Sequence, residues 1–227
     1  MIAIHGAVVR VSLPLSNPGM RTFDPAHESA QNIYKLMIGA IVPRPIAFVS
    51  SLDERGVRNL APFSFFTAVS ADPPVVLFCP MVRMEDPERG LAAHKDTLLN
   101  IINTREFVIN VVTESIAEKM NATSAQVPPE IDEFELAGLT PMASELVKPP
   151  RVAESPVQME CRLLRIVEVS DRPSGGSIVL GEVLRFHVRE DLVENFRIDP
   201  DKLAAVGRMG GPTYVRTRDR FDLQRPA

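Results

Sequence analysis

The stretch from Arg44 to Pro80 constrains the fold of this chain more than any other part. It contains two apolar runs, Ile46–Ser51 and Val75–Cys79, with small and polar residues between them. Asp53–Gly56 has the composition of a turn, because Gly tolerates positive φ and Asp can accept hydrogen bonds from nearby backbone. We therefore predict a β-hairpin whose crossing carries a binding site.

Further strands and short helices are predicted on either side of this stretch. Val157–Ser170 alternates apolar and polar residues, and Ile178–Arg189 follows it after a Gly-rich turn, which is typical of a long hairpin. Residues 29–40 and the segment from Asp96 or Thr97 to Thr104 have helical spacing of apolar residues. Because strands come in hairpins rather than alternating with helices, we predict a mainly β fold, an antiparallel barrel with peripheral helices.

Composition indicates a globular protein and excludes several classes. The 227 residues, 45% hydrophobic and 24% charged, suffice for one domain with a sizeable core. A net charge of -4 gives no basic excess, so we predict no nucleic-acid partner, and no run is long enough to span a membrane. Cys79 and Cys161 lie far apart in apolar runs and no signal peptide is evident, which favours a reducing, cytoplasmic location.

The familiar catalytic motifs are absent from the sequence. The four histidines form no pair at metal-ligand spacing, and there is no CxxC pair, so we predict no metal site. A GxSxG elbow, a GxGxxG turn and a phosphate-binding Walker loop are also missing. We name no catalytic residue, and any redox reactivity must come from a bound cofactor.

Lys95, Asp96 and Thr97 stand at the predicted start of a helix. The free backbone N–H groups and the helix dipole make such an end suitable for an anion such as a phosphate monoester. Lys95 adds a positive charge and Thr97 a hydroxyl donor. Taken alone, the more common explanation is that Asp96 caps the helix and Lys95 is solvated.

Two other groups of residues extend this hypothesis. Arg44, Ser50 and Ser51 would add phosphate donors, although a surface arginine and two turn hydroxyls are the commoner interpretation. Asn59–Ser64 combines small side chains, which let a flat ligand approach the backbone, with polar groups, and the adjoining phenylalanines offer stacking. The alternative is a bulged strand with Phe63, Phe65 and Phe66 in the core. Alternation places Phe63 and Phe65 on one face of that strand, opposite Ser64 and Phe66.

Several segments, taken in order, resemble the flavin reductase-like, FMN-binding split-barrel proteins, in particular their flavoredoxin-like branch. These segments are RPIAFVSSLDERGVRNLAPFSFF, ADPPVVLF, KDTLLNI, EFVINVV, MECRLLRIVEV, IVLGEVLRFHV and GGPTYVRTRDRF. The resemblance runs from about Asn32 to Pro226 and implies a six-stranded antiparallel split β-barrel over residues 31–227. Residues 1–30 are left as an N-terminal arm. A homodimer with FMN at or near the subunit interface is also implied.

The resemblance carries over site residues by position. It places Ser50 and Ser51 near the ribityl-phosphate and Lys95, Asp96 and Thr97 on the phosphate side. The residues that match the loop along the isoalloxazine ring are Asn59, Leu60, Ala61 and Ser64. Arg44 matches an arginine between prolines that marks the branch, and its phosphate contact is our inference. His187 and Tyr214 are weaker candidates for the substrate side; a backbone-bonded strand histidine and a packed tyrosine are the alternatives.

The sequence thus predicts an FMN-dependent oxidoreductase of the flavin reductase type. NADH or NADPH would donate hydride to the flavin, and electrons would pass to free flavin, a monooxygenase partner or a small acceptor. The alternatives are an electron-transfer module that holds FMN and is reduced by a partner protein, and a barrel that has lost flavin and only dimerises. The choice between NADH and NADPH, and whether FAD is accepted as well as FMN, are left open by the sequence.

Overall fold

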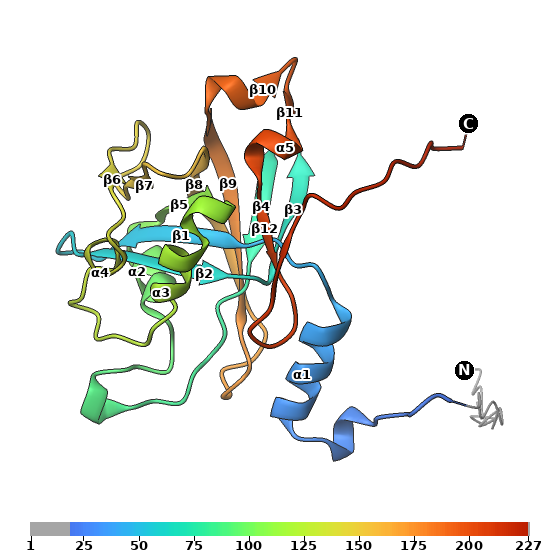
Figure 1. The fold of residues 1–227 in the computed structure, drawn as a ribbon. Helices are drawn as coiled ribbons and strands as arrows, with labels where there is room; N and C mark the ends of the chain where they lie inside the picture. The colour runs from blue at the N-terminus through green and yellow to red at the C-terminus, as the bar shows by residue number, and fades with distance from the viewer. Residues whose placement is uncertain (1–18, 227) are drawn as a thin grey trace, which may run out of the picture.

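The computed structural model describes residues 19–226, and Figure 1 shows how their elements are arranged. The predicted N-terminal arm falls largely outside the described residues. The main sheet is antiparallel throughout. In spatial order its strands are β2 (Arg58–Phe63), β1 (Ala47–Leu52), β5 (Glu106–Val111), β8 (Val157–Glu168), β9 (Ser177–Val188), β4 (Pro74–Phe78) and β3 (Phe66–Ala71).

The sheet has seven strands where six were predicted, because the segment after Arg58 divides in two. β2 and β3 are consecutive in the chain and only Ser64 and Phe65 separate them, yet they form opposite edges of the sheet. The sheet must therefore curve until its edges approach each other at this corner, while the two strands remain unpaired. This is the predicted split barrel, and the corner at Ser64 becomes one wall of the candidate site.

The β8–β9 hairpin is the longest pairing in the barrel and confirms the predicted partners. Its register shifts twice, at Glu160/Cys161 and at Leu163/Arg165, which adds the twist that a strongly curved sheet needs. Gly181 on β9 faces the ring of Phe107, and a Cβ at this position would lie 2.3 Å from that ring. Glycine is therefore required where the aromatic ring packs against the strand.

Two hydrophobic clusters cover both faces of the first half of β1, which explains why Ala47, Phe48 and Val49 are all apolar rather than alternating with polar residues. Ala47 and Val49 point into the barrel with Phe78 and Phe107. Phe48 points outward and packs with other side chains of a second cluster, which includes Leu60, Met120 and Phe134. Burying each large apolar side chain stabilises the fold by about 1.5–3 kcal/mol. β1 is thus held rigidly, and β2 beside it carries part of the site.

Helices and small two-stranded sheets surround the barrel (Figure 1). The helices are α1 (Ala30–Ala40), α2 (Asp96–Thr104), α3 (Ala117–Ala122), α4 (Glu133–Ala137) and α5 (Pro200–Leu203). Short 3-10 turns are η1 (Pro25–His27), η2 (Pro87–Arg89), η3 (Glu114–Ile116) and η4 (Glu190–Leu192). The paired short strands are β6 (Pro141–Met142) with β7 (Arg151–Val152), β10 (Val193–Glu194) with β11 (Arg197–Ile198), and β12 (Val206–Arg208) with β13 (Tyr214–Arg216).

The predicted helix at residues 29–40 is confirmed as α1, but its packing is unusual. Ser29 caps it by accepting a hydrogen bond from the N–H of Asn32. None of its residues is buried, and Leu36 and Met37 are 41% and 44% exposed. Figure 1 shows α1 standing apart from the barrel, joined to it at its C-terminal end. Its apolar residues therefore have no core of their own to fill.

Candidate functional site

A cavity of about 280 Å³ lies beside the corner where β2 ends. Its walls come from β2, the loop between β4 and α2, the start of α2, the loop after α3, and the first residues of α4, with α1 at one end. The lining residues that carry the argument below are Tyr34, Asn59, Ser64, Arg83, Lys95 and Glu133. Elements far apart in the sequence therefore build one site.

One end of the cavity is cationic. Lys95 stands at the N-cap of α2, and no side chain caps this helix. Asp96 and Thr97 were predicted as possible caps, but the helix already begins at Asp96. The backbone N–H groups of Asp96 and Thr97 take part in none of the hydrogen bonds found among the described residues. A negatively charged group is the natural partner for such free donors at a helix start.

Arg83 strengthens this positive end and was not anticipated from the sequence. Its side chain is only 9% exposed, and its Nε donates to the carbonyl of Ala92 at 2.6 Å. Its Nη2 has no hydrogen-bond partner among the described residues and lies 3.6 Å from a carboxylate oxygen of Asp96. Burial lowers the pKa of Lys95, and the neighbouring charge of Arg83 lowers it further, against the opposing effect of Asp96. An anion bound here would offset the repulsion between the positive charges of Lys95 and Arg83.

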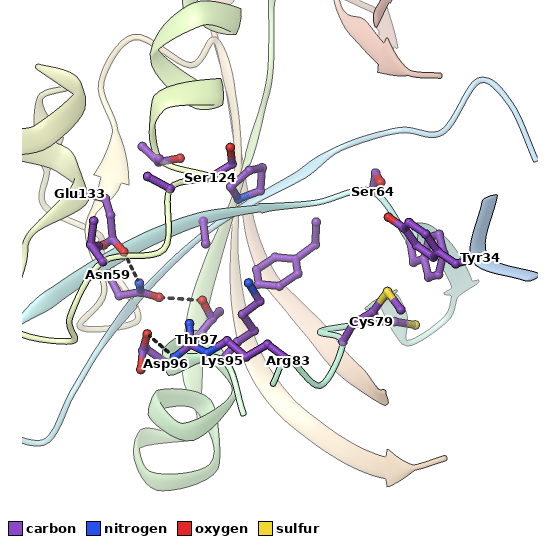
Figure 2. A pocket seen from close by; sticks show the side chains of 18 residues that line it. Tyr34, Asn59, Ser64, Cys79, Arg83, Lys95, Asp96, Thr97, Ser124 and Glu133 are labelled. Carbon is purple, nitrogen blue, oxygen red and sulfur yellow. Dashed lines mark hydrogen bonds and ion pairs between the residues drawn. The ribbon is translucent and has the colours of Figure 1, made fainter. Parts of the chain in front are cut away.

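A chain of hydrogen bonds forms the wall behind this end (Figure 2). Thr97 Oγ1 donates to Asn59 Oδ1 at 2.6 Å, and Asn59 Nδ2 donates to Glu133 Oε1 at 2.9 Å. Glu133 Oε2 accepts from the backbone N–H of Leu60 at 3.0 Å. Asn59 Oδ1 also accepts from Ser51 Oγ at 3.2 Å. The Thr97 hydroxyl, predicted as a phosphate donor, therefore uses its hydrogen on Asn59.

The ionisation of Glu133, which lines the cavity, is strongly perturbed. It is 5% exposed. Burial raises its pKa to about 7, against the hydrogen bonds from Leu60 and Asn59, and the negative charge of Asp96 adds to the rise. The cavity therefore contains a carboxyl group that gains and loses its proton near neutral pH.

The other end of the cavity is aromatic. Figure 2 shows Tyr34 beside Ser64 and Cys79, away from Asp96 and Thr97. The rings of Tyr34 and Phe65 lie 6.4 Å apart between centroids, at 46°. Alternation predicted that Phe65 would share one face of the strand with Phe63, opposite Ser64 and Phe66. The strand breaks at Ser64 instead, so Phe65 turns towards Tyr34 while Phe63 and Phe66 pack on the barrel core.

The predicted site residues divide into those that line this cavity and those that support it from behind. The lining members are Asn59, Ala61, Ser64, Lys95, Asp96 and Thr97. The side chain of Leu60 packs in the second hydrophobic cluster, with Phe48, and its backbone N–H donates to Glu133. Ser50 donates to the carbonyl of Pro150, and Ser51 accepts from Asn100 Nδ2 at 3.1 Å. The guanidinium of Arg44 donates hydrogen bonds to the backbone carbonyls of Ile38, Ile41 and Met209.

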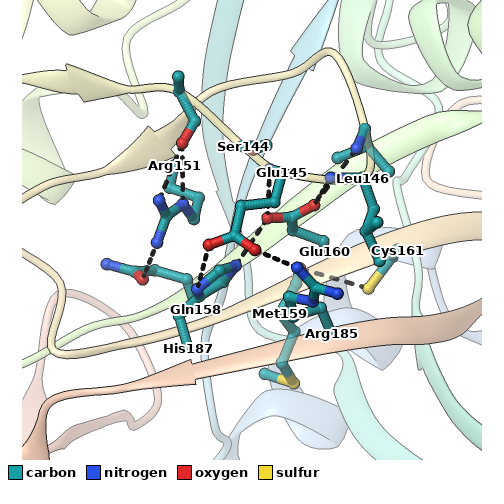
Figure 3. Close-up of polar contacts among 12 residues, drawn as sticks. Ser144, Glu145, Leu146, Arg151, Gln158, Met159, Glu160, Cys161, Arg185 and His187 are labelled. Atoms are coloured by element: carbon teal, nitrogen blue, oxygen red, sulfur yellow. Dashed lines mark hydrogen bonds and ion pairs between the residues drawn. The ribbon is translucent and has the colours of Figure 1, made fainter.

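The two weaker candidates, His187 and Tyr214, are outside the lining of the cavity. His187 Nε2 lies 2.6 Å from Glu160 Oε1, in the polar cluster of Figure 3. Tyr214 donates its hydroxyl to Asn121 at 3.0 Å, and Arg208 stacks over its ring at 4.4 Å. Both side chains are engaged within the chain itself.

Three lining residues were missed from the sequence, for different reasons. Arg83 lies in a loop with Pro and Gly that matches no motif, and only its position after an apolar strand was informative. Glu133 belongs to the long excursion between β5 and β8, which was predicted only to drape over the barrel. Tyr34 lies on α1, where helical spacing drew attention to the apolar residues.

Neither a metal site nor a membrane-spanning helix is present in residues 19–226. No three His, Cys, Asp or Glu side chains of this range come together as a metal site. Within the same range, no helix is long and apolar enough to cross a membrane.

A family model, described as the flavin reductase like domain, matches residues 38–207, which is most of the chain. The chain belongs to this family. The family is the one that the sequence resembled, and the observed split barrel agrees with it. The matched range includes every predicted site residue except Tyr214.

A curated relative and two solved structures match this chain over most of their own length. An uncharacterized protein of Aquifex aeolicus is 41% identical over 185 residues, covering 81% of this chain and 89% of its own. The crystal structure of nitrilotriacetate monooxygenase component B from Bacillus cereus superposes with a TM-score of 0.82 and 37% identity, covering 90% of this chain and 98% of that one. The 2-nitrobenzoate 2-nitroreductase NbaA of Pseudomonas fluorescens gives 0.78 and 34%, covering 91% and 96%.

Proposed function

We propose that this chain is an FMN-binding oxidoreductase that takes hydride from NADH or NADPH and passes electrons to a separate acceptor. The single observation that carries the proposal is the cavity with two unlike ends. One end holds Lys95, the buried Arg83 and the free N–H groups of α2, and the other holds Tyr34 and Phe65. FMN has the same two parts, a phosphate and a flat ring.

The residues present fit FMN on chemical grounds. The Nη2 atom of Arg83 is buried without a hydrogen-bond partner among the described residues, which is costly unless a ligand completes it. A phosphate would accept from it, from Lys95 and from the N–H groups of Asp96 and Thr97. Bound FMN would supply the hydride and electron chemistry, and the protein would supply binding and orientation.

The supporting residues then have definite tasks. Asn59 is fixed by Glu133 and Thr97, so its side-chain amide is held in one orientation at the cavity wall. Ala61 and Pro62 are small enough for a flat ligand to approach the β2 backbone. Phe65 and Tyr34 exclude water from the aromatic end. No residue is required as an acid or base catalyst for hydride transfer to a flavin.

We also propose that the protein acts as a homodimer. The cavity of one chain, about 280 Å³, is just below the ~300–1,000 Å³ typical of small-molecule pockets, so a second chain could complete it. Apolar side chains of α1 are exposed, and so are Val69 and Phe186 on the barrel, at 51% and 55%. Light scattering of the purified protein should give a mass of two chains; a monomer at micromolar concentration would exclude this arrangement.

Two structural relatives suggest which electron acceptors this protein could use. The structural relative from Bacillus cereus is named as a monooxygenase component, and the relative from Pseudomonas fluorescens as a nitroreductase. By analogy, the electrons of this protein would reach either a monooxygenase partner or a small oxidised substrate.

The test is an anaerobic absorption spectrum of the protein with FMN, before and after NADH or NADPH is added. We expect a protein-bound flavin spectrum that bleaches within seconds, and the faster nucleotide identifies the donor. A bound flavin that only dithionite reduces would overturn the nicotinamide step and favour an electron-transfer protein that is reduced by a partner. No bound flavin in excess FMN would overturn the cofactor assignment.

A further inference from the structure

Arg44 is one of the most buried charged residues of the chain, and its contacts point away from the role that its sequence position suggested. It is 4% exposed. Nη1 donates to the carbonyls of Ile38 at 2.6 Å and Ile41 at 2.7 Å, and Nη2 donates to the carbonyl of Met209 at 2.9 Å. Nε points to Ser64 Oγ at 3.4 Å.

These contacts occupy most of the guanidinium. An arginine has five N–H donors, and the bonds to carbonyls and the hydroxyl use four of them. Arg44 is also absent from the lining of the cavity. A phosphate at the cationic end, beside Lys95, would therefore not be its partner.

Two of the carbonyls that Arg44 binds belong to the C-terminal end of α1. Ile38 lies in the last turn of α1, and Ile41 is its C-cap, where carbonyl groups lack partners within the helix. A cation at this end also interacts favourably with the helix dipole. Since no residue of α1 is buried, Arg44 is a main attachment of the helix to the barrel.

The same helix carries Tyr34 to the aromatic end of the cavity. Tyr34 is 37% exposed, and its ring centroid lies 6.4 Å from that of Phe65 at the strand break. Ser64 at that break is the hydroxyl that Arg44 approaches. One side chain therefore connects the helix, the loop at Met209 and the corner of the barrel that forms the cavity wall.

We propose that Arg44 is a positioning residue of the flavin site, which fixes α1 to the barrel and thereby places Tyr34 against the ring end of the cavity. The ligand part of this inference rests on the proposed function, whereas the placement of Tyr34 does not. Arg44 would then affect binding of the flavin ring, and it would not distinguish a flavin with a phosphate from one without.

The first measurement needs no ligand. The sequence contains two tyrosines and no tryptophan, so in a Tyr214→Phe background the tyrosine emission comes from Tyr34 alone. Acrylamide quenching of this emission reports how exposed Tyr34 is. We expect Arg44→Lys to raise the quenching constant about twofold, because a lysine cannot hold three carbonyls in a fork. Arg208→Lys is the matched control, since Arg208 pairs with Arg44 through the backbone and its side chain donates to Gly211 instead of α1.

The second measurement uses FMN and riboflavin as probes, with dissociation constants from flavin fluorescence. We expect Tyr34→Ala to weaken both about tenfold through the loss of ring contact. Arg44→Lys should weaken both by a similar factor, and the double variant should be no weaker than Tyr34→Ala. Circular dichroism confirms that each variant is folded.

The outcomes separate the two proposals. Unchanged quenching in folded Arg44→Lys, or a loss of FMN affinity without a loss for riboflavin, overturns the positioning role, and the second result would make Arg44 a phosphate ligand. If Arg44→Lys does not fold, Tyr34→Ala still decides, because unchanged riboflavin binding there overturns the inference. Raised quenching in a protein that binds no flavin would sink the proposed function while supporting the placement of Tyr34.

Discussion

Two glutamates are buried on opposite sides of β1 and β5, and their surroundings differ. Glu160 on β8 is fully buried, and its carboxylate accepts from the backbone N–H groups of Glu145, Leu146 and Val147 as well as lying against His187 (Figure 3). Burial raises its pKa, but these hydrogen bonds and His187 outweigh burial and hold the pKa below its ordinary value.

Glu133 is almost as buried but has fewer donors. It accepts one backbone N–H and one side-chain amide, and Asp96 is the charged group that acts on it most. Lys95 and Arg83 line the same cavity, and two charged side chains on adjoining elements, Arg58 and Lys119, are bound to other partners. Its pKa therefore rises to about 7.

The difference separates a structural cluster from a binding site. Around Glu160 each donor and acceptor has found its partner within the chain, so the cluster stabilises the loop at 145–147 against β8 and β9. Around Glu133 the charges are incompletely paired: Nη2 of Arg83 is buried without a hydrogen-bond partner among the described residues, and no side chain caps α2. Incomplete pairing at a cavity is what a ligand site requires before its ligand arrives.

The largest loss of unfolding free energy should come from removing the charge of Glu160, whose hydrogen bonds are all made within the chain. Glu160→Gln leaves three backbone N–H groups facing a neutral amide, and breaking such a buried charged network costs about 3 kcal/mol of unfolding free energy. Urea denaturation at neutral pH measures it. Glu133→Gln is the matched control and should cost about 1 kcal/mol, because the native group is already partly neutral there. Equal losses in the two variants would remove the distinction.

The pH dependence of stability should distinguish the same two groups. Because the folded pKa of Glu133 is raised from 4.5 to about 7, the folded protein holds the extra proton between these values, and stability falls as pH rises through them. We expect wild type to lose on the order of 2 kcal/mol more than Glu133→Gln between about pH 5 and pH 7.5.

Glu160 should behave in the opposite sense. Its lowered pKa contributes stability that is present above the ordinary glutamate pKa and lost as pH falls through the folded value. Glu160→Gln should therefore keep the decline between about pH 5 and pH 7.5 that Glu133→Gln loses. A wild-type curve parallel to that of Glu133→Gln would show that Glu133 titrates normally.

The barrel was largely predictable from the sequence because its signals are local. Short stretches of consecutive residues predicted the hairpin of Val157–Ser170 with Ile178–Arg189 and the turn at Asp53–Gly56. Both are present in the structure. The division of β2 from β3 was missed, since nothing in Ser64 or Phe65 forbids a continuous strand. The family resemblance supplied the split barrel that periodicity alone left as an antiparallel barrel.

The site was predictable only in part, because side-chain destinations depend on distant backbone. Lys95 was found from its place at a helix start, and Asn59 from small neighbours. Arg83 and Glu133 enter the cavity through loops whose course no local pattern gives. Arg44 was recognised as special by position, but its hydrogen-bond partners at Ile38 and Met209 could be known only once the chain had folded.

The most direct test of the central claim, that the unpaired donors form a phosphate site, is to compare the dissociation constants of FMN and riboflavin. We expect wild type to prefer FMN about 100-fold, from charge-assisted bonds to Lys95, Arg83 and the N–H groups of α2. Lys95→Met should reduce that preference about tenfold and leave riboflavin binding unchanged. Equal affinity of the wild-type protein for FMN and riboflavin would contradict the account.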